Sequence, residues 1–332
     1  MESRTKLALS ESTVRRLFAA AGISEITDIA VLGAGEFNAV YAAKGNKQAY
    51  VLKVAPGIDI PVLHYEQGMM RAEVFWYSQM REHTDIRVPE VYYTDFSHQL
   101  IPADWFIMER LPGEQLDQIK LSAGEKAAVD RRLAQMVAAM HKISGERFGY
   151  VQNELYADWY AALHAMTENL LHDARAKGKR SKRGERLLGL EEKYRTVLSR
   201  AECTMVNFDI WAPNILCRRT ENGMECMWID PERCFWGDRI ADFFCLEFGA
   251  PLKKKAKTLA AYNAAAKTPI RVTRDEQIRY ALMLGYAALI METEKYYRYT
   301  PRHFGWWRNV AASFYLYQSA FRELRAIEHE TQ

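Results

Sequence analysis

The residues with the sharpest chemical signature lie in residues 207–214, where an aspartate is followed five positions later by an asparagine. Transfer of a phosphoryl group to a hydroxyl needs both residue types. A carboxylate such as that of Asp209 can orient the hydroxyl and accept its proton. An amide oxygen such as that of Asn214 can bind a magnesium ion that neutralises a triphosphate. Aspartate and asparagine are also common in polar turns, so this segment alone leaves both interpretations open.

A second aspartate, Asp230, ends the apolar segment Met-Trp-Ile-Asp at residues 227–230, a short hairpin's length after Asn214. A carboxylate at this place can be a second magnesium ligand, next to the β- and γ-phosphates of a nucleotide. An isolated aspartate at a strand end would instead indicate a turn or a cap. The spacing from Asp209 and Asn214 favours the metal site.

A glycine-rich turn precedes these residues in the chain. Residues 33–38 follow the pattern G-x-G-x-x-N between two predicted strands, and Val40 lies two positions beyond. Glycines such as Gly33 and Gly35 let a hairpin backbone approach phosphates closely, and a valine at this offset can cover a nucleobase. An ordinary hairpin turn is the alternative.

Lys53 lies in the apolar strand candidate 49–54, so its ammonium group is expected to point inward and to need a partner. Glu73, on the helix predicted next, can supply that partner, and Glu66 is a competing one. Such a lysine and glutamate pair binds the α- and β-phosphates in kinases. The alternative is a lysine whose ammonium group reaches out to water from an edge strand.

In this order, these features resemble the aminoglycoside phosphotransferase family of small-molecule kinases, over roughly residues 29–249. The resemblance is most specific at residues 207–214, at Ile229 with Asp230, and at residues 237–243 (GDRIADF). Residues 105–113 (WFIMERLPG) look like the hinge between the family's two lobes. The resemblance implies an α+β, protein-kinase-like fold with a small antiparallel β-sheet lobe that carries one main helix, and a larger, mainly α-helical lobe.

The resemblance also implies roles at individual positions. Asp209 is expected to be the catalytic base, with Asn214 and Asp230 as magnesium ligands and Lys53 gripping phosphate under the control of Glu73. The expected cofactors are ATP or GTP, and Mg. The backbone at the hinge should bond the nucleobase, through Met108, Glu109 and Arg110. Asp238 and Asp242 are expected to brace the catalytic loop.

The chain departs from the family pattern at two places. Asn207 stands where the family usually has a histidine, but an asparagine can also hydrogen-bond backbone groups, so altered rigidity rather than lost activity is expected. Asn38 replaces a third loop glycine, and asparagine tolerates left-handed geometry.

The elements that must position these residues follow from local patterns. A helix is expected over residues 9–22 and another over 65–82, with strands over 29–32, 39–43, 49–54, 90–95 and 105–109. Pro112 and Gly113 then interrupt regular structure. We therefore expect a nucleotide-binding lobe over residues 1–110 and a catalytic, acceptor-binding lobe over 111–332. The second lobe should be helical from a capping box at Ser122, with long helical stretches over 158–176 and 275–329 and strands only at 204–209 and 227–230.

Composition narrows the class of protein. The chain has 332 residues, 49% of them hydrophobic, and a net charge of only +3, so it lacks the basic excess of a nucleic-acid binder. No apolar run approaches the ~18 residues of a membrane span, and the N-terminus has no signal-peptide core. Five cysteines without a C-x-x-C pair argue against a disulfide framework or a zinc site. A cytoplasmic protein, monomeric or weakly dimeric, is expected.

The acceptor is expected to be a small molecule, cationic or glycosylated, and an antibiotic such as an aminoglycoside is the first candidate, which would make the protein a resistance enzyme. Candidate acidic residues of the acceptor site lie in the expected helical lobe: Glu154, Asp158, Glu232, Glu247, Glu292 and Glu294. A macrolide, a basic peptide antibiotic, an amino alcohol or a sugar stays open as the acceptor. So does a catalytically dead nucleotide-binding protein, for which Asn207 and the incomplete glycine loop would be the markers.

Overall fold

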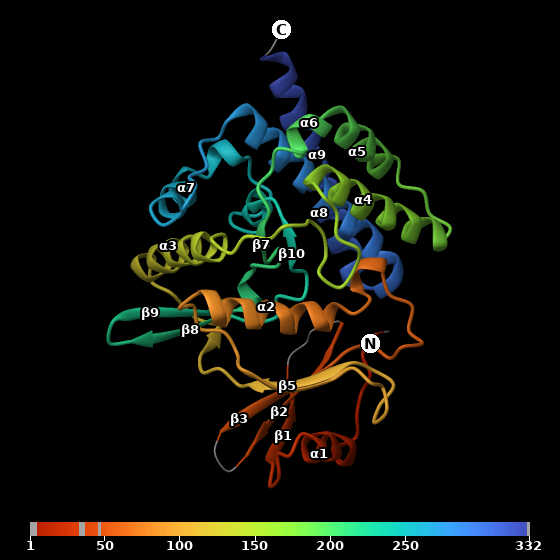
Figure 1. Ribbon diagram of the computed structural model, residues 1–332, viewed down its shortest axis with the longest axis vertical. Coiled ribbons are helices and arrows are strands. Elements are labelled where there is room, and N and C mark those ends of the chain that lie inside the picture. Colours follow the sequence, from red (N-terminus) through yellow and green to blue (C-terminus); the bar gives the residue numbers. More distant parts are fainter. Residues whose placement is uncertain (1–4, 33–36, 46–47, 331–332) are drawn as a thin grey trace. The chain divides into compact units, whose positions relative to one another are not determined.

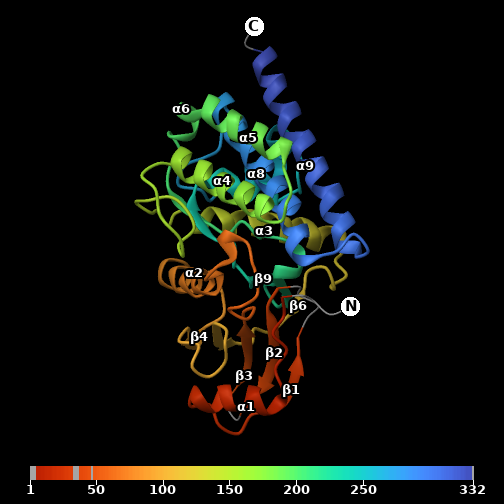
Figure 2. The ribbon, with the colours of Figure 1, turned by 90° about the vertical axis from the view of Figure 1, so that its right-hand side faces the viewer.

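The computed structural model describes residues 5–32, 37–45 and 48–330, and its α+β architecture confirms the predicted fold class. Contacts within the chain divide it into two compact units. The first unit comprises residues 1–62 and 87–112, and the second comprises residues 63–86 and 113–332. Figures 1 and 2 show the β-sheet of the first unit and the helices of the second.

The first unit is an antiparallel sheet with one helix. Its strands lie in the order β1-β2-β3-β5-β4. The elements are α1 (Glu11–Ala20), β1 (Thr27–Val31), β2 (Ala39–Lys44), β3 (Ala49–Val54), β4 (Val91–Asp95) and β5 (Trp105–Glu109). The helix α1 is shorter than the expected range 9–22, because the Ser10 side chain caps it by accepting a hydrogen bond from the backbone of Thr13, and Gly22, just beyond its end, adopts a φ of +73°.

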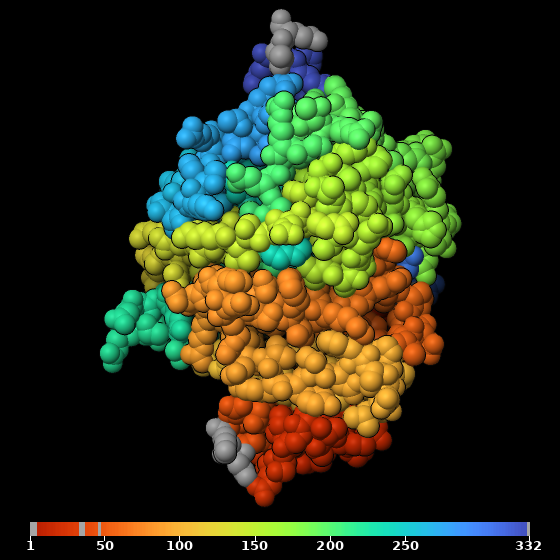
Figure 3. All heavy atoms as spheres, in the orientation of Figure 1, coloured from red at the N-terminus to blue at the C-terminus, as the bar shows by residue number. Residues whose placement is uncertain are grey.

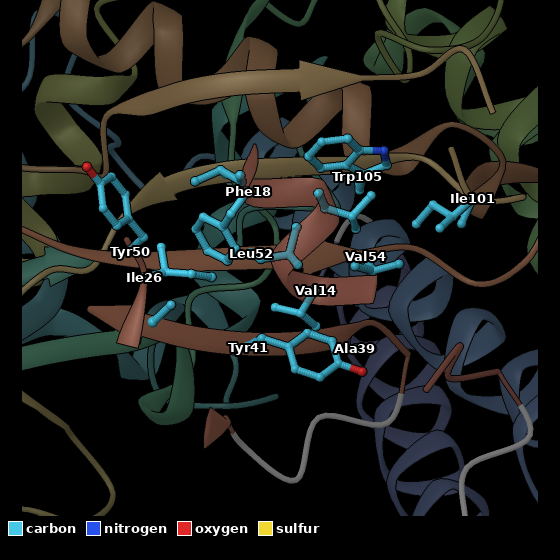
Figure 4. Close-up of a cluster of buried hydrophobic side chains, with 14 residues drawn as sticks. Val14, Phe18, Ile26, Ala39, Tyr41, Tyr50, Leu52, Val54, Ile101 and Trp105 are labelled. Atoms are coloured by element: carbon cyan, nitrogen blue, oxygen red, sulfur yellow. The ribbon is translucent and has the colours of Figure 1, made fainter. Parts of the chain in front are cut away.

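One face of this sheet forms a hydrophobic core with α1. Val14, Leu17 and Phe18 of the helix are fully buried against side chains of the strands, which include Leu52 and Trp105 (Figure 4). Successive side chains of a strand point to opposite faces of a sheet. The residues that alternate with this core set on β2 and β3 therefore face away from α1.

The second unit is mainly helical. Its helices are α2 (Met69–His83), α3 (Ala123–Met140), α4 (Trp159–Ala176), α5 (Lys182–Lys193), α6 (Arg195–Leu198), α7 (Ala256–Asn263), α8 (Arg274–Arg298) and α9 (Phe304–His329). Its 3-10 helices are η1 (His64–Glu66), η2 (Ala212–Asn214), η3 (Arg239–Phe244) and η4 (Leu252–Lys254). Its strands are β6 (Glu114–Gln115), β7 (Thr204–Val206), β8 (Ile215–Thr220), β9 (Gly223–Trp228) and β10 (Phe235–Gly237).

Several boundaries differ from the sequence-based expectations. The helix expected from residue 65 begins at Met69, because Gly68 is in the left-handed region at φ +69° and separates η1 from α2. The helical stretch expected over 275–329 is two helices, since Pro301 lies in the turn between α8 and α9. The strand expected to reach Asp209 ends at Val206. The capping box of Ser122 with Glu125 is confirmed.

The helix α2 groups with the second unit, although the sequence pattern placed it with the strands before residue 110. Its contacts explain this grouping. The ring of Trp76 lies 5.9 Å from that of Trp228, and the Cys234 thiol donates to the carbonyl of Ala72 at 3.3 Å. The assignment of nucleotide binding and catalysis to two lobes stays a prediction.

The β8–β9 hairpin is the most protruding strand pair of the second unit, and its tip projects into solvent in Figure 3. The other end of the hairpin is buried, with Ile215 paired to Trp228. The loop 207–214 enters the hairpin at this buried end.

A buried carboxylate anchors the first residues of the loop 207–214. Asp242 of η3 is fully buried, and its Oδ1 accepts a hydrogen bond from the backbone N–H of Phe208 at 2.7 Å. Its Oδ2 accepts a longer bond from the N–H of Asn207 at 3.3 Å. The expected bracing role of Asp242 is therefore confirmed.

The imidazole of His141 holds Asp242 in turn. The Nε2 of His141, at the end of α3, lies 2.9 Å from Asp242 Oδ2, and the Nδ1 of the same ring lies 3.0 Å from the hydroxyl of Tyr262. The neighbouring Asp238 accepts a bond from Arg279 of α8 at 2.6 Å. A buried charge is tolerated when it is paired and hydrogen-bonded in this way.

No helix among the described residues is long and apolar enough to cross a membrane. All five cysteines are free.

Replacing Asp242 by alanine should lower the free energy of unfolding by about 3–5 kcal/mol, because two backbone N–H groups and His141 lose their buried partner. Asp130 provides a matched control, since its carboxylate is exposed and forms only a surface ion pair with Lys126. The Asp130→Ala change should alter stability by no more than about 0.5 kcal/mol. Urea unfolding followed by circular dichroism measures both. Equal stability of the two variants would contradict the bracing role.

Candidate active site

Strand pairing in the second unit brings the sequence-predicted catalytic residues together. The strand β7 leads into the loop 207–214, and the loop ends in η2 at Asn214. The β8–β9 hairpin then returns the chain, and the N–H of Ile229 donates to the carbonyl of Asn214 at 3.0 Å. Asn214 and Asp230 therefore lie at the same end of the hairpin.

Asp209 and Asn214 are in direct contact. The Asn214 Nδ2 donates to Asp209 Oδ2 at 2.9 Å and to the Asp209 carbonyl at 3.1 Å. Asn207, which replaces the family's usual histidine, accepts a hydrogen bond from the N–H of Asp209 at 3.0 Å. This contact confirms that an asparagine at this place can hydrogen-bond the backbone of the loop.

The backbone on both sides of the site is strained. Phe208 has a φ of +60° and Asp230 a φ of +59°, in the left-handed region that costs non-glycine residues about 1–3 kcal/mol. The Phe208 ring is buried and packs on Phe244 and Phe235, at centroid distances of 4.6 and 5.2 Å. Packing of this ring and the bonds to Asp242 therefore maintain the conformation that presents Asp209.

The carboxyl group of Asp209 has an unusual proton affinity. Its withdrawal from bulk water raises its pKa to about 6, while the Arg233 guanidinium acts in the opposite direction and Asp230 adds to the rise. A general base works best when its pKa is close to the operating pH. The environment of Asp209 therefore suits proton acceptance from a hydroxyl.

Three carboxylates form a candidate cation site next to this base. Oxygen atoms of Glu73, Asp230 and Glu232 all lie within 4.8 Å of one another. The N–H of Asp230 donates to the Tyr77 hydroxyl at 2.9 Å, and this hydroxyl donates to Glu73 at 3.1 Å. Carboxylate and amide oxygens are the ligands that magnesium prefers, so this group and the adjacent Asn214 fit such an ion.

Sequence reasoning missed the role of Arg233, three residues after Asp230. Its guanidinium donates to Glu294 at 2.7 Å, and the hydroxyl of Tyr65 donates to the same carboxylate oxygen at 2.7 Å. Arg298 lies 3.4 Å from Glu294 and also bonds Glu66. Glu294 had been considered as an acceptor residue, but it is buried within this network. The short spacing between Arg233 and Asp230 was the signal that could have indicated a role for this arginine.

The first unit presents two of the predicted nucleotide-binding residues on one face of its sheet. Val40 and Lys53 are directly paired across β2 and β3, and both alternate with the residues that pack on α1. Gly33 and Gly35 lie outside the described residues.

The predicted hinge residues Met108, Glu109 and Arg110 lie at the end of β5. The N–H groups of Glu109 and Arg110 already donate to the carbonyls of Glu90 and Ala49, at 2.7 and 3.1 Å. These two donors are therefore used within the sheet, and the binding of a nucleobase by this segment stays a prediction.

Lys53 belongs to the first unit and Glu73 to the second, so their pairing stays a prediction. Glu66, the competing partner of Lys53, bonds Arg298 and the backbone of Leu63 instead.

The candidate acceptor carboxylates do not form one group. Asp158 caps α4 by accepting from the N–H of Ala161, and Glu292 accepts from the hydroxyls of Ser181 and Tyr317. Glu247 bonds the hydroxyl of Thr258, and Glu232 belongs to the candidate cation site. Glu154 is exposed and lines a cavity.

The chain is similar to known phosphotransferases. A model of the phosphotransferase enzyme family (APH) matches residues 28–276. The structure resembles a microcompartment-associated aminopropanol kinase with a TM-score of 0.63 and 16% identity, over 96% of this chain and 98% of that one. It resembles the streptomycin and ATP complex of APH(2'')-IIa with a TM-score of 0.58 and 18% identity, over 93% and 97% of the two chains.

A third similar structure is that of the aminoglycoside phosphotransferase APH(4)-Ia, with a TM-score of 0.58 and 17% identity, over 95% of this chain and 99% of that one. At sequence identities of 16–18%, these three similarities show that the proteins share a fold. A comparison with curated proteins finds no match. Because the family model covers well over half of the 332 residues, the chain belongs to the phosphotransferase enzyme family.

Proposed function

We propose that this enzyme transfers the γ-phosphoryl group of ATP or GTP to a hydroxyl of a small molecule, with Asp209 as the catalytic base. The observation that carries the proposal is the contact of Asp209 with Asn214 beside Asp230, at the end of the β8–β9 hairpin. In the proposed step, the acceptor oxygen forms a bond to the γ-phosphorus as the bond from that phosphorus to the nucleoside diphosphate breaks. The hydroxyl proton goes to an oxygen of Asp209.

The oxygen ligands at this site support a magnesium cofactor. Asn214 and Asp230 would hold the ion, and Glu73 and Glu232 lie close enough to complete its surroundings. When bound, magnesium would neutralise the charge of the β- and γ-phosphates. Relatives of known structure are described with ATP, ADP and GDP, which supports a nucleotide as the donor.

The acceptor proposed first is an antibiotic such as an aminoglycoside, which would make the enzyme a resistance factor. Two of the similar structures are complexes of APH(2'')-IIa with streptomycin and with gentamicin. A second candidate is a small amino alcohol. The similarity to an aminopropanol kinase favours it, as does the internal bonding of Asp158 and Glu292, two of the candidate acceptor carboxylates.

A panel assay of nucleoside diphosphate release tests these proposals directly. Purified protein with magnesium and ATP or GTP is offered aminoglycosides, basic peptide antibiotics, macrolides, amino alcohols and sugars. Release that depends on one acceptor class would identify that class. Tight nucleotide binding without release for any acceptor would support the alternative of a catalytically dead protein, against which the presence of Asp209, Asn214, Asp230 and Lys53 argues.

Asp209→Asn should lower kcat by at least about 100-fold, because the amide cannot accept the hydroxyl proton. Nucleotide affinity, measured by calorimetry, should stay within about threefold of the native value, which is less than 1 kcal/mol. The exposed Asp117, changed to asparagine, is the matched control and should keep native turnover. Near-native turnover of Asp209→Asn would refute the proposed mechanism.

Asp230→Ala should remove most of the gain in nucleotide affinity that magnesium provides, because a carboxylate ligand of the ion is lost. We expect at least a tenfold weaker affinity in the presence of magnesium, or about 1.4 kcal/mol, and a much smaller change in its absence. Calorimetric titrations with and without magnesium separate the two effects. The same magnesium-dependent gain in the variant and in the native protein would show that Asp230 is not a ligand.

A further inference from the structure

The second unit contains a cavity that none of the proposed catalytic or metal-binding residues lines. Its volume is about 260 Å³, and it lies between η1, the segment that precedes α4, and α4 itself. Its walls are formed by eleven residues: His64, Tyr65, Tyr150, Asn153, Glu154, Tyr156, Ala165, Met166, Asn169, Leu170 and Asp173. In Figures 1 and 2, the orange segment that contains η1 lies beside α4, in agreement with their direct contacts.

Three tyrosines supply the aromatic part of the wall. The rings of Tyr65 and Tyr150 are stacked at 5.4 Å. Their hydroxyls bond residues that do not line the cavity: that of Tyr65 donates to Glu294, and that of Tyr150 lies 3.0 Å from the hydroxyl of Tyr286. Tyr65 and Tyr150 are only 4% and 2% exposed, so Tyr156 is the more exposed tyrosine of the wall, and its ring is the surface that best suits an organic cation.

Two carboxylates add negative charge to this aromatic wall. Asp173 is 7% exposed, and its Oδ2 accepts a hydrogen bond from the backbone N–H of His64 at 2.8 Å. Glu154 is exposed, and the Tyr156 hydroxyl lies 3.5 Å from its Oε2. Among the described residues that line the cavity, none is a lysine or an arginine. Burial raises the pKa of Asp173, while the hydrogen bond from the His64 backbone and the nearby imidazoles of His64 and His172 act in the opposite direction.

We propose that this cavity binds a small organic cation, an amine or a quaternary ammonium group, between the tyrosine rings and the carboxylates of Glu154 and Asp173. Aromatic faces combined with carboxylates favour a weakly hydrated cation over a metal ion or an anion. Two amides, those of Asn153 and Asn169, are available for N–H groups or hydroxyls of the ligand.

The site is distinct from the proposed catalytic centre, because no residue of 207–232 lines the cavity. Its wall is nevertheless linked to that centre. Tyr65 donates to Glu294, which also accepts from Arg233, and the charge of Arg233 acts on Asp209. A cation beside Tyr65 would therefore contact a member of the hydrogen-bond network that surrounds the proposed base. Occupancy of the cavity does not depend on the proposed phosphoryl transfer.

Tetramethylammonium is a suitable probe, because it carries the charge and, having no hydroxyl, cannot be a phosphoryl acceptor. Calorimetry on the full chain should show one binding site with a Kd between about 10 μM and about 10 mM, the range that a ligand of five heavy atoms can reach. The neutral tert-butyl alcohol, of similar size, should bind at least about tenfold more weakly. Equal binding of the two probes, or no binding of tetramethylammonium, would overturn the proposal.

Substitutions of the two carboxylates test whether the probe binds in the cavity. Combined Glu154→Gln and Asp173→Asn changes should weaken tetramethylammonium binding at least about tenfold, while Glu146→Gln, a change of an exposed glutamate in the same connecting segment, should leave it unchanged. If Asp173→Asn prevents folding, Glu154→Gln alone should weaken binding at least about threefold. Unchanged affinity in Glu154→Gln would overturn the assignment.

Asp209→Asn separates this proposal from that of phosphoryl transfer. The variant should bind tetramethylammonium as the native protein does, even though its transfer activity is lost. Loss of probe binding in Asp209→Asn would show that the cation occupies the catalytic centre instead, and would overturn the assignment of a second site.

Discussion

The geometry of the active site depends on one buried carboxylate. Asp242 accepts hydrogen bonds from the N–H groups of Asn207 and Phe208, immediately before the proposed base, and His141 holds the carboxylate from the other side. The positive φ of Phe208 would be unfavourable in a free loop. The protein core therefore imposes the conformation of this loop. Such preorganisation is the main way in which a phosphoryl-transfer enzyme can contribute to a reaction that depends on positioning and electrostatics.

A second layer of interactions sets the charge around the base. Burial and Asp230 raise the pKa of Asp209, whereas Arg233 lowers it, so the value of about 6 reflects opposing effects. Arg233 cannot move freely, because Glu294 binds it together with Tyr65. Removing one member of such a buried network leaves an uncompensated charge, which is more damaging than the loss of the pair itself. The proton affinity of the base is thus linked to α8 and to the segment that precedes α2.

Sequence patterns predicted those helix ends and strands that depend on residues close together in the chain. The strands of the first unit and the Ser122 capping box follow from periodicity and capping residues, whereas β8, which pairs with β9 between Asn214 and Asp230, was not predicted. The pairing of Tyr65 with Glu294 joins residues 229 positions apart, and no local pattern indicates it. The same limit applies to the acceptor residues, because a carboxylate such as Glu292 has the same sequence signature whether it faces solvent or accepts bonds from Ser181 and Tyr317.

The internal bonding of these carboxylates bears on how an acceptor is recognised. A polycation needs several carboxylates that are free to pair with it, because each ammonium group loses hydration on binding. Asp158, Glu247 and Glu292 each have a structural partner inside the second unit. By contrast, Trp211 is 52% exposed although it lies in the catalytic loop between Asp209 and Asn214. An exposed indole at this place offers a flat apolar surface next to the base, of the kind that packs against the face of a sugar ring. The two acceptors proposed above, an aminoglycoside and a small amino alcohol, differ in whether they carry a ring that could use this surface.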